Sequence, residues 1–325
     1  MKIVVIDDYQ NAFRKLDCFA RLKGHEVAVF HDTEKDPARL AVRLKDADAV
    51  VLTQQRSAFP RAVVEKLPAT LKLIAQTGRN TSHIDVTACS EKGIVVAAAG
   101  GGTSYSTAEL TWGLIIASLR SIPHEVQQLK QGVWQTTVGT GLYGKTLGVY
   151  ALGKIGSCVA RVGAAFGMKV ICWGREASLA KAREQGYAAA ADREEFFASA
   201  DVISLHIPLN QETRGIVTAA DLARMKPAAL IVNTSRAPII AAGALVAALE
   251  RGRPGQAAID VYEEEPVIGG DHPLLRMPNV LCTPHLGYVE KGTYENYYGT
   301  VIDSILGFAA GKPVNVLNPE AHAKK

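Results

Sequence analysis

Short apolar runs alternate with longer amphipathic stretches along most of the 325-residue chain. Apolar runs bounded by turn residues are typical of strands buried on both faces, and the stretches between them have helical periodicity. We therefore predict an α/β fold with parallel sheets that helices cover on both faces. Strands are expected at residues 2–6, 26–30, 49–52, 71–75 and 94–96, and then at 146–150, 169–173, 201–205, 229–233, 256–260 and 279–282.

A triple glycine at residues 100–102 separates these two series of strands. It lacks the Lys-Ser/Thr of a phosphate loop, so we interpret it as a hinge that ends in a helix cap at Thr103 or Ser104. Pro123 is expected to kink or split the long helical stretch that follows. Residues 293–310 predict a last helix that packs back on the first series.

Two doubly wound parallel-sheet domains follow from this pattern. We expect a discontinuous, flavodoxin-like substrate domain formed by residues 1–99 and 288–325. Residues 100–287 are expected to form a Rossmann dinucleotide-binding domain.

Composition and charge then exclude several classes of protein. Hydrophobic residues make up 48% of the chain, and the net charge of +4 is spread without a basic run, so we predict a globular protein with no nucleic-acid partner. No apolar run reaches the ~18 residues that span a bilayer, and the first residues do not resemble a signal peptide. The five cysteines are scattered without a CxxC motif. We expect free thiols, no metal, no membrane partner and a cytoplasmic location.

The stretch at residues 147–173 has the order strand, glycine turn, helix, strand. Its core, Ala151-Leu152-Gly153-Lys154-Ile155-Gly156, fits GxGxxG with alanine in the first position. Gly153 would let the backbone approach a diphosphate, Gly156 would let the helix pack close to the strand, and N–H groups from Lys154 onward would face the diphosphate. The alternative is a tight turn that binds nothing. We predict dinucleotide binding.

The tip of the next strand bears on which form of the cofactor is used. An acidic residue normally holds the adenosine ribose there, but this chain has Gly174 followed by Arg175. Without that carboxylate a 2′-phosphate meets no repulsion, and Arg175 could bind it. The alternative is that Arg175 points into solvent and Glu176 takes the ribose. We predict NAD(P), with NADP(H) slightly favoured over NAD(H).

Strongly functional side chains follow three of the later expected strands. They are Arg236 in NTSRAPI, Asp260 and Glu265 in AAIDVYEEEP, and His285 in TPHLG. Each is ordinary alone. Together they offer what reduction of a 2-oxo acid needs: a cation for the carboxylate, a proton donor near neutral pH, and a carboxylate that keeps this donor charged.

The ordered set ALGKIG, LHIPLNQETRGIV, MKPAALIVNTSRAPII, AAIDVYEEEP and TPHLG resembles the D-isomer-specific 2-hydroxyacid dehydrogenases. This family includes glycerate, D-lactate and phosphoglycerate dehydrogenases and glyoxylate/hydroxypyruvate reductases. The resemblance covers nearly the whole chain. It implies that Arg236 binds the substrate, that His285 is the acid/base with Glu265 as its partner, and that Asp260 holds the nicotinamide amide or keeps the histidine region in order.

The same resemblance implies further contacts. Main-chain N–H groups of Arg79 and Asn80 would hold the substrate carboxylate. Cofactor contacts would fall on Thr107, Leu152, Gly153, Lys154, Ile155, His206, Pro208, Thr213, Thr234 and Gly287. The long helix after the hinge is the usual dimer element, which implies a homodimer.

The sequence also departs from the family. Ala237 stands where glycine is usual, and we expect it to crowd the turn beside Arg236. Glu265 stands where the formate branch has glutamine, which argues against formate as substrate.

Two alternatives stay open beside the dehydrogenase that acts on a small 2-hydroxy or 2-oxo acid. One is a non-catalytic, NAD-sensing module related to corepressors, and the other is a dehydrogenase of another small anion such as phosphite. Tyr288 and Trp134 are expected to line the cleft. The particular acid is left open.

Overall fold

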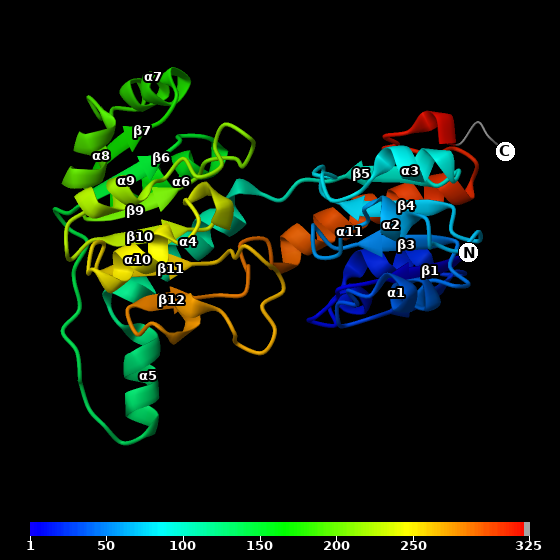
Figure 1. Cartoon of the computed structure of the whole chain (residues 1–325), viewed down its shortest axis with the longest axis horizontal. Coiled ribbons are helices and arrows are strands. Elements are labelled where there is room, and N and C mark those ends of the chain that lie inside the picture. Colours follow the sequence, from blue (N-terminus) through cyan, green and yellow to red (C-terminus); the bar gives the residue numbers. More distant parts are fainter. Residues whose placement is uncertain (322–325) are drawn as a thin grey trace. The chain divides into compact units, whose positions relative to one another are not determined.

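The computed structural model describes residues 1–321. The chain divides into two compact units, Met1–Gly102 with Glu290–Lys325, and Thr103–Val289 (Figure 1). These limits lie within three residues of the expected domain boundaries. No helix within residues 1–321 has the length and apolar character needed to cross a membrane. All five cysteines lie in this part of the chain and are free thiols, as expected.

The first unit contains a five-stranded parallel sheet, as the alternation of apolar and amphipathic stretches predicts. Its strands are β1 (Lys2–Val5), β2 (Glu26–Val29), β3 (Ala49–Leu52), β4 (Leu73–Thr77) and β5 (Val95–Ala99). They lie in the order β2-β1-β3-β4-β5, which is the order of flavodoxin-like sheets.

Helices cover both faces of this sheet. One core contains residues from β1, β3, β4 and β5 together with residues from the α helices of the first hundred residues, which are α1 (Pro37–Arg43), α2 (Arg61–Val64) and α3 (Val86–Glu91). The last long helix, α11 (Lys291–Ala309), packs against β4 and β5 and against the 3-10 helix η2 (Asp17–Leu22). The rings of Phe13 and Tyr298 lie 4.9 Å apart there. The expected return of the last helix to the first unit is confirmed.

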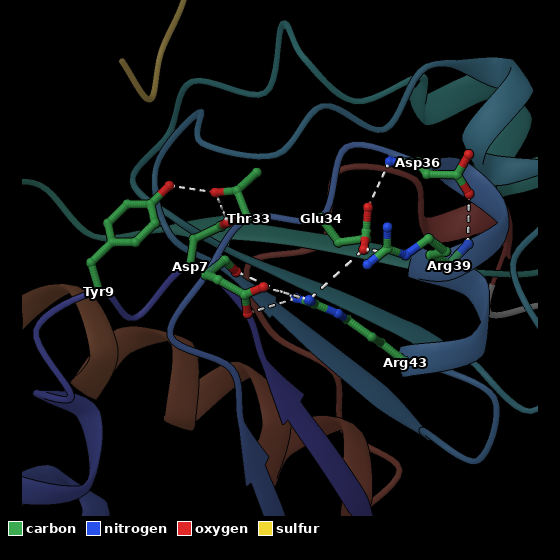
Figure 2. A network of polar contacts seen from close by, with 8 residues as sticks. Asp7, Tyr9, Thr33, Glu34, Asp36, Arg39 and Arg43 are labelled. Atoms are coloured by element: carbon green, nitrogen blue, oxygen red, sulfur yellow. Dashed lines mark hydrogen bonds and ion pairs between the residues drawn. The ribbon is translucent and has the colours of Figure 1, made fainter. Parts of the chain in front are cut away.

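A polar network connects the end of β1 to the loop after β2 (Figure 2). Asp7 has a left-handed backbone with φ of 63°, and its carboxylate accepts a 2.6 Å hydrogen bond from Thr33 Oγ1. Tyr9 reaches the same hydroxyl, and Arg43 pairs with Glu34 in the same loop. Burial raises the pKa of Asp7. These contacts fix the segment that enters α1.

The second unit contains a seven-stranded parallel sheet. Its strands are β6 (Thr146–Tyr150), β7 (Lys169–Trp173), β8 (Ala188–Ala189), β9 (Val202–Leu205), β10 (Leu230–Asn233), β11 (Gln256–Ile259) and β12 (Val280–Cys282). They lie in the order β12-β11-β10-β9-β6-β7-β8, so the direction of winding reverses between β6 and β9. The six expected strands are confirmed. We did not predict β8, because this two-residue strand consists of alanines and is identified only by its pairing with β7.

Alternate residues of these strands enter two separate cores, one on each face. The first core contains Tyr150, Ile203 and Ile231 and is covered by α8 (Arg193–Ser199), α9 (Ala219–Arg224) and α10 (Ala244–Glu250). The second contains Val149, Val202 and Val232 and is covered by α4 (Ser104–Leu119), α6 (Lys154–Ala165) and α7 (Glu176–Glu184).

The start and the end of α4 also match the sequence pattern. Thr103 caps α4 by accepting a hydrogen bond from the Ser106 N–H, as expected of the residue after the hinge. Ser121, with φ of 51°, ends this helical stretch, and Pro123 lies in the first turn of α5 (Ile122–Lys130). The helix is therefore split, and α5 with the segment after it projects from its unit (Figure 1).

Candidate active site

The carboxyl ends of the seven parallel strands meet at one edge of the sheet, which we call the carboxyl edge. The residues that follow these strands directly are Ala151 after β6, Gly174 after β7, His206 after β9 and Asp260 after β11. Arg236 and His285 each follow their strand by three residues, after β10 and β12. The parallel strands therefore bring the predicted residues of the second unit to one edge of the sheet. This is the edge at which doubly wound sheets bind their ligands.

The glycine turn after β6 leaves room for a diphosphate. A Cβ at Gly153 would contact nothing within 4 Å, whereas one at Gly156 would meet the Ala151 carbonyl oxygen at 2.3 Å. Gly153 is the N-cap of α6 and no side chain caps this helix, so its first N–H groups stay available to an anion. Ala151 has φ of 72°, a conformation that costs an L-residue about 1–2 kcal/mol. The turn therefore fits a dinucleotide, at some cost in strain at Ala151.

The charged side chains at the tip of β7 are exposed to solvent. Arg175 Nη2 pairs with Glu212 Oε2 at 2.7 Å, and the two side chains are 74% and 79% exposed. Glu176 pairs with Arg183 at 2.8 Å. Gly174 places no side chain beside them, and a Cβ there would approach Ser178 at 3.2 Å. Ser178 Oγ accepts a hydrogen bond from the Leu152 N–H, which joins α7 to the glycine turn.

The middle of the edge is formed by polar groups that are buried, such as Thr213 and Thr234, or partly buried, such as His206. His206 hydrogen bonds to Ser204 at 2.9 Å, and burial lowers its pKa to about 4, so the imidazole is neutral at pH 7. Thr213 Oγ1 donates to the Pro208 carbonyl at 2.7 Å, and the Thr234 and Thr111 hydroxyls are 2.9 Å apart. These contacts hold the loops after β9 and β10 in place.

Asp260, fully buried after β11, organises the segment around His285. Its two oxygens accept hydrogen bonds from Thr283 Oγ1 at 2.6 Å, from the Leu286 N–H at 2.7 Å and from the Gly287 N–H at 3.0 Å. Burial raises the pKa of Asp260, and these donors oppose that rise. These hydrogen bonds tie Asp260 to the segment that carries His285, and both roles expected for Asp260 stay predictions.

Gly287 connects this segment to α4. Its carbonyl accepts from the hydroxyls of Ser106 at 2.8 Å and Thr107 at 2.9 Å. Thr107, an expected cofactor contact, therefore also has a structural partner.

His285 and Glu265 form the one close acid–imidazole pair among the predicted catalytic residues. His285 Nδ1 lies 2.7 Å from Glu265 Oε2, and the side chains are 16% and 17% exposed. The other carboxylate oxygen of Glu265 accepts a hydrogen bond from the Tyr262 N–H at 3.0 Å. Since a carboxylate only accepts, the imidazole Nδ1 carries hydrogen, and Nε2 is the atom left for a substrate.

Two aromatic residues are expected to line the cleft. The ring of Tyr288 meets that of His285 edge to face at 5.5 Å. The side chain of Trp134 is 73% exposed and lies in a groove with residues of α4 and α5. The expected place of Trp134 in the cleft stays a prediction.

Arg236 lies in a turn that the neighbouring strands hold. Asn233 Nδ2 donates to the Arg236 carbonyl at 3.0 Å, and Ser235 Oγ donates to the Ile207 carbonyl at 2.5 Å. Arg236 Nη1 donates to the Ser235 carbonyl at 2.7 Å. Ala237 begins the 3-10 helix η3 (Ala237–Ile239) without a left-handed backbone, so the backbone conformation at this position does not require glycine. The expected crowding beside Arg236 stays a prediction.

Arg79 and Asn80 belong to the first unit, directly beyond Gly78 at the carboxyl end of β4. Both are exposed. The Asn80 carbonyl accepts a hydrogen bond from Gln55 Nε2 at 3.3 Å, and its side chain accepts from the Ser82 N–H at 3.1 Å. Their expected contact with a substrate stays a prediction.

Sequence reasoning did not single out two residues at the carboxyl edge. Thr283 stands in the TPHLG stretch, and only its bond to Asp260 shows what it does. Glu212 stands in a polar loop, where nothing in the sequence signals its approach to Arg175.

Comparison with known proteins identifies the family to which the chain belongs. Residues 112–287 match the family model of the D-isomer specific 2-hydroxyacid dehydrogenase, NAD binding domain. The chain is 36% identical to the glyoxylate reductase of Aeropyrum pernix, with 92% of this chain and 91% of that protein covered. An oxidoreductase from Ralstonia solanacearum has a solved structure with 49% identity and a TM-score of 0.94, covering 99% of this chain and 98% of that one.

The chain is also 42% identical to the D-3-phosphoglycerate dehydrogenase of Methanocaldococcus jannaschii over 88% of its own length. It spans about half the length of that relative, 53%. The family model, the relatives and the fold show that the chain belongs to the D-isomer-specific 2-hydroxyacid dehydrogenase family, and its second unit contains the family's NAD-binding domain.

Proposed function

We propose that this protein transfers a hydride between a nicotinamide cofactor and C2 of a small 2-hydroxy or 2-oxo acid. The observation that carries the proposal is the 2.7 Å pair of His285 and Glu265 at the same sheet edge as the glycine turn. Both halves of the reaction, a proton-transfer group and a dinucleotide cradle, are thus present in one unit.

The roles of the residues follow from their chemistry. Arg236 binds the substrate carboxylate in a charge-assisted contact and orients C2. Nε2 of His285 gives a proton to the 2-oxo oxygen in reduction and takes it back in oxidation. Glu265 accepts the Nδ1–H, fixes the ring and balances the charge of the imidazolium. The bound cofactor supplies or accepts the hydride.

Other residues support this chemistry from nearby. Asp260 holds the backbone at Leu286 and Gly287, and through it the position of His285. Arg79 and Asn80 contribute main-chain N–H groups to the substrate carboxylate. The glycine turn from Leu152 to Gly156, with Thr107, His206, Pro208, Thr213, Thr234 and Gly287, contacts the cofactor.

Both NAD(H) and NADP(H) are proposed as cofactors, with NADP(H) slightly favoured. Support for NADP(H) comes from Gly174 and Arg175 at the tip of β7, which offers a cation and no carboxylate of its own. A cytoplasmic setting belongs to the same proposal, since the five free cysteines suit a reducing compartment.

A homodimer is also part of this proposal. The projecting α5 and the residues after it expose Ile122, Val126, Leu129, Val133 and Trp134 along a groove of about 400 Å³. An apolar patch of this kind on a surface helix suits an interface with a second copy. Light scattering of the protein and of Leu129→Asp tests this: we expect a dimer, and a monomer in the variant.

Turnover of a small panel tests the reaction itself. Glyoxylate, hydroxypyruvate and pyruvate are each offered with NADH and with NADPH, and phosphite is offered with NAD⁺ and NADP⁺. Reduction of at least one 2-oxo acid is expected. Cofactor binding without any turnover would favour a sensing module, and turnover of phosphite alone would favour the other dehydrogenase.

A further inference from the structure

The exposed pair at the tip of β7 has a second consequence, which rests on the proposed function. We propose that Glu212 and Arg175 form a cofactor-selecting pair. Glu212 supplies, from the loop after β9, the ribose-binding carboxylate that β7 lacks. Arg175 leaves Glu212 and binds the 2′-phosphate when NADP(H) occupies the site.

The geometry brings the two charges to the place where the adenosine ribose is bound in this fold. Arg175 directly follows Gly174 at the end of β7, and its guanidinium lies 2.7 Å from Glu212 Oε2. Because Gly174 has no side chain, nothing on β7 itself fills the position that an acidic residue normally takes. Glu212 therefore brings a carboxylate to the strand tip from a different part of the sequence.

The loop that carries Glu212 is fixed on both sides of it. The Asn210 N–H donates to Thr213 Oγ1 at 2.8 Å, the Thr213 N–H donates to Asn210 Oδ1 at 3.0 Å, and Thr213 Oγ1 reaches the Pro208 carbonyl. Thr213 is only 5% exposed. The backbone of Glu212 is thus held in a closed turn while its side chain projects into solvent, so the loop aims the carboxylate at Arg175 without burying it.

The other acidic residue at this tip is Glu176, whose Oε1 pairs with Arg183 at 2.8 Å within the helix α7. Glu212 is the carboxylate that adjoins Arg175, the cation of the proposed pair. Because both ion pairs are exposed, the comparison of Glu212→Gln with Glu176→Gln decides which carboxylate binds the ribose.

The ion pair of Arg175 and Glu212 is weak because it is exposed, and this weakness allows it to select between the two cofactors. An ion pair this exposed contributes less than about tenfold to an equilibrium constant, so a ligand separates it easily. A ribose diol donates to the Glu212 carboxylate, whereas a 2′-phosphate is repelled by Glu212 and attracted by Arg175. With both Glu212 and Arg175 present, NAD(H) and NADP(H) bind with similar affinity. Removal of one of the two side chains changes the ratio of these affinities.

Direct binding measurements test the pair. The dissociation constants of NAD⁺, NADP⁺, ADP and 2′,5′-ADP are measured by titration calorimetry for the full chain and for two variants. In Glu212→Gln we expect NADP⁺ and 2′,5′-ADP to bind about 5- to 10-fold more tightly and NAD⁺ about 3- to 10-fold more weakly, the size of one charged hydrogen bond. In Arg175→Gln we expect NADP⁺ and 2′,5′-ADP to weaken about 10-fold or more, with NAD⁺ within about 3-fold.

Glu176→Gln and Arg183→Gln are matched controls, because they remove one charge each from the neighbouring exposed pair. Their NADP⁺-to-NAD⁺ ratio should stay that of the unsubstituted protein. An unchanged ratio in Glu212→Gln, or a loss of NAD⁺ affinity in Glu176→Gln instead, overturns the selecting pair and leaves the proposed reaction standing. If the unsubstituted chain binds neither NAD⁺ nor NADP⁺, both proposals fail together.

Discussion

The two ends of the carboxyl edge in the second unit are built differently. At the end formed by β10, β11 and β12, function is assigned to side chains that are largely buried and hydrogen bonded, such as Asp260 and the pair of His285 and Glu265. At the end formed by β6 and β7, the glycine turn leaves room for the backbone to act, and its charged side chains are exposed.

The two ends of the edge differ because proton transfer and diphosphate binding have different structural requirements. A group that transfers a proton must hold one position, and buried hydrogen bonds supply that rigidity. A turn that receives a diphosphate needs space and free N–H groups, which the absence of side chains supplies. We therefore expect the first end to be most sensitive to removal of a side chain and the second end to addition of one.

Removal of His285 should have the largest effect. His285→Ala is expected to lower kcat by ~10²–10⁴-fold, the usual size of general acid–base catalysis, with little change in the dissociation constant of the cofactor. Steady-state kinetics on the best 2-oxo acid of the panel measures it. His272→Ala is the matched control, because His272 forms a comparable pair with Glu263 at 3.1 Å and is assigned no step. Near-full activity of His285→Ala would remove His285 from the mechanism.

Addition of a methyl group at Gly156 should come next. The new Cβ would meet the Ala151 carbonyl oxygen at 2.3 Å, a backbone contact that only a shift of α6 relieves. We expect Gly156→Ala to lower the free energy of unfolding by about 1–3 kcal/mol, as overpacking typically does. Urea unfolding followed by tryptophan fluorescence reports on the second unit, because Trp112, Trp134 and Trp173 all lie in it.

Gly153→Ala is the control for that experiment, since a Cβ there meets nothing within 4 Å. It should leave the free energy of unfolding nearly unchanged while weakening cofactor binding. Equal destabilisation by the two substitutions would contradict the contrast drawn between the two glycines.

Acid should lower the free energy of unfolding of the second unit through the partly buried His206 in the middle of the edge. Burial lowers the pKa of His206 from 6.5 to about 4, so between these values the unfolded chain binds a proton that the folded chain does not. The contribution of neutral His206 to the free energy of unfolding is therefore fully present above pH 6.5. It is lost as the pH falls from 6.5 toward 4, at about 1.4 kcal/mol per pH unit. Urea unfolding at pH 7, 6 and 5 measures the slope.

His206→Gln should make that slope shallower. His83 in the first unit has its pKa lowered to about 4 in the same way, so His83→Gln controls for a histidine outside the tryptophan-reporting unit. A slope that changes in His83→Gln and not in His206→Gln would contradict the assignment of the acid sensitivity to His206 in the second unit.

Replacement of Ala151 should have the smallest effect. Glycine accepts the left-handed backbone that Ala151 now adopts at φ of 72°, so Ala151→Gly relieves strain at some cost in chain entropy. We expect a gain of roughly 0.5–1 kcal/mol in the free energy of unfolding. Ala160→Gly, in the buried middle of α6, should instead lose about 1 kcal/mol or more. A loss at both positions would mean that Ala151 is not strained.

The sequence by itself determined the fold class, the order of strands and helices, and the kinds of residue at the strand ends. The apolar strand runs and the GxGxxG spacing are local properties of the sequence. The rules for connecting parallel strands leave few possible topologies, so the strand order could be expected as well. The alanine strand β8 was missed because its residues favour no strand until β7 lies beside them.

Only the tertiary structure decided which of the candidate groups meet. Glu265 and His285 are 20 residues apart and Arg175 and Glu212 are 37 apart, and each distance depends on how neighbouring strands pair. The same holds for Asp260, whose three donors come from beyond the next strand. Residue type states what a side chain is able to do, but partners, burial and the resulting pKa values arise only when the sheet brings separate loops to one edge.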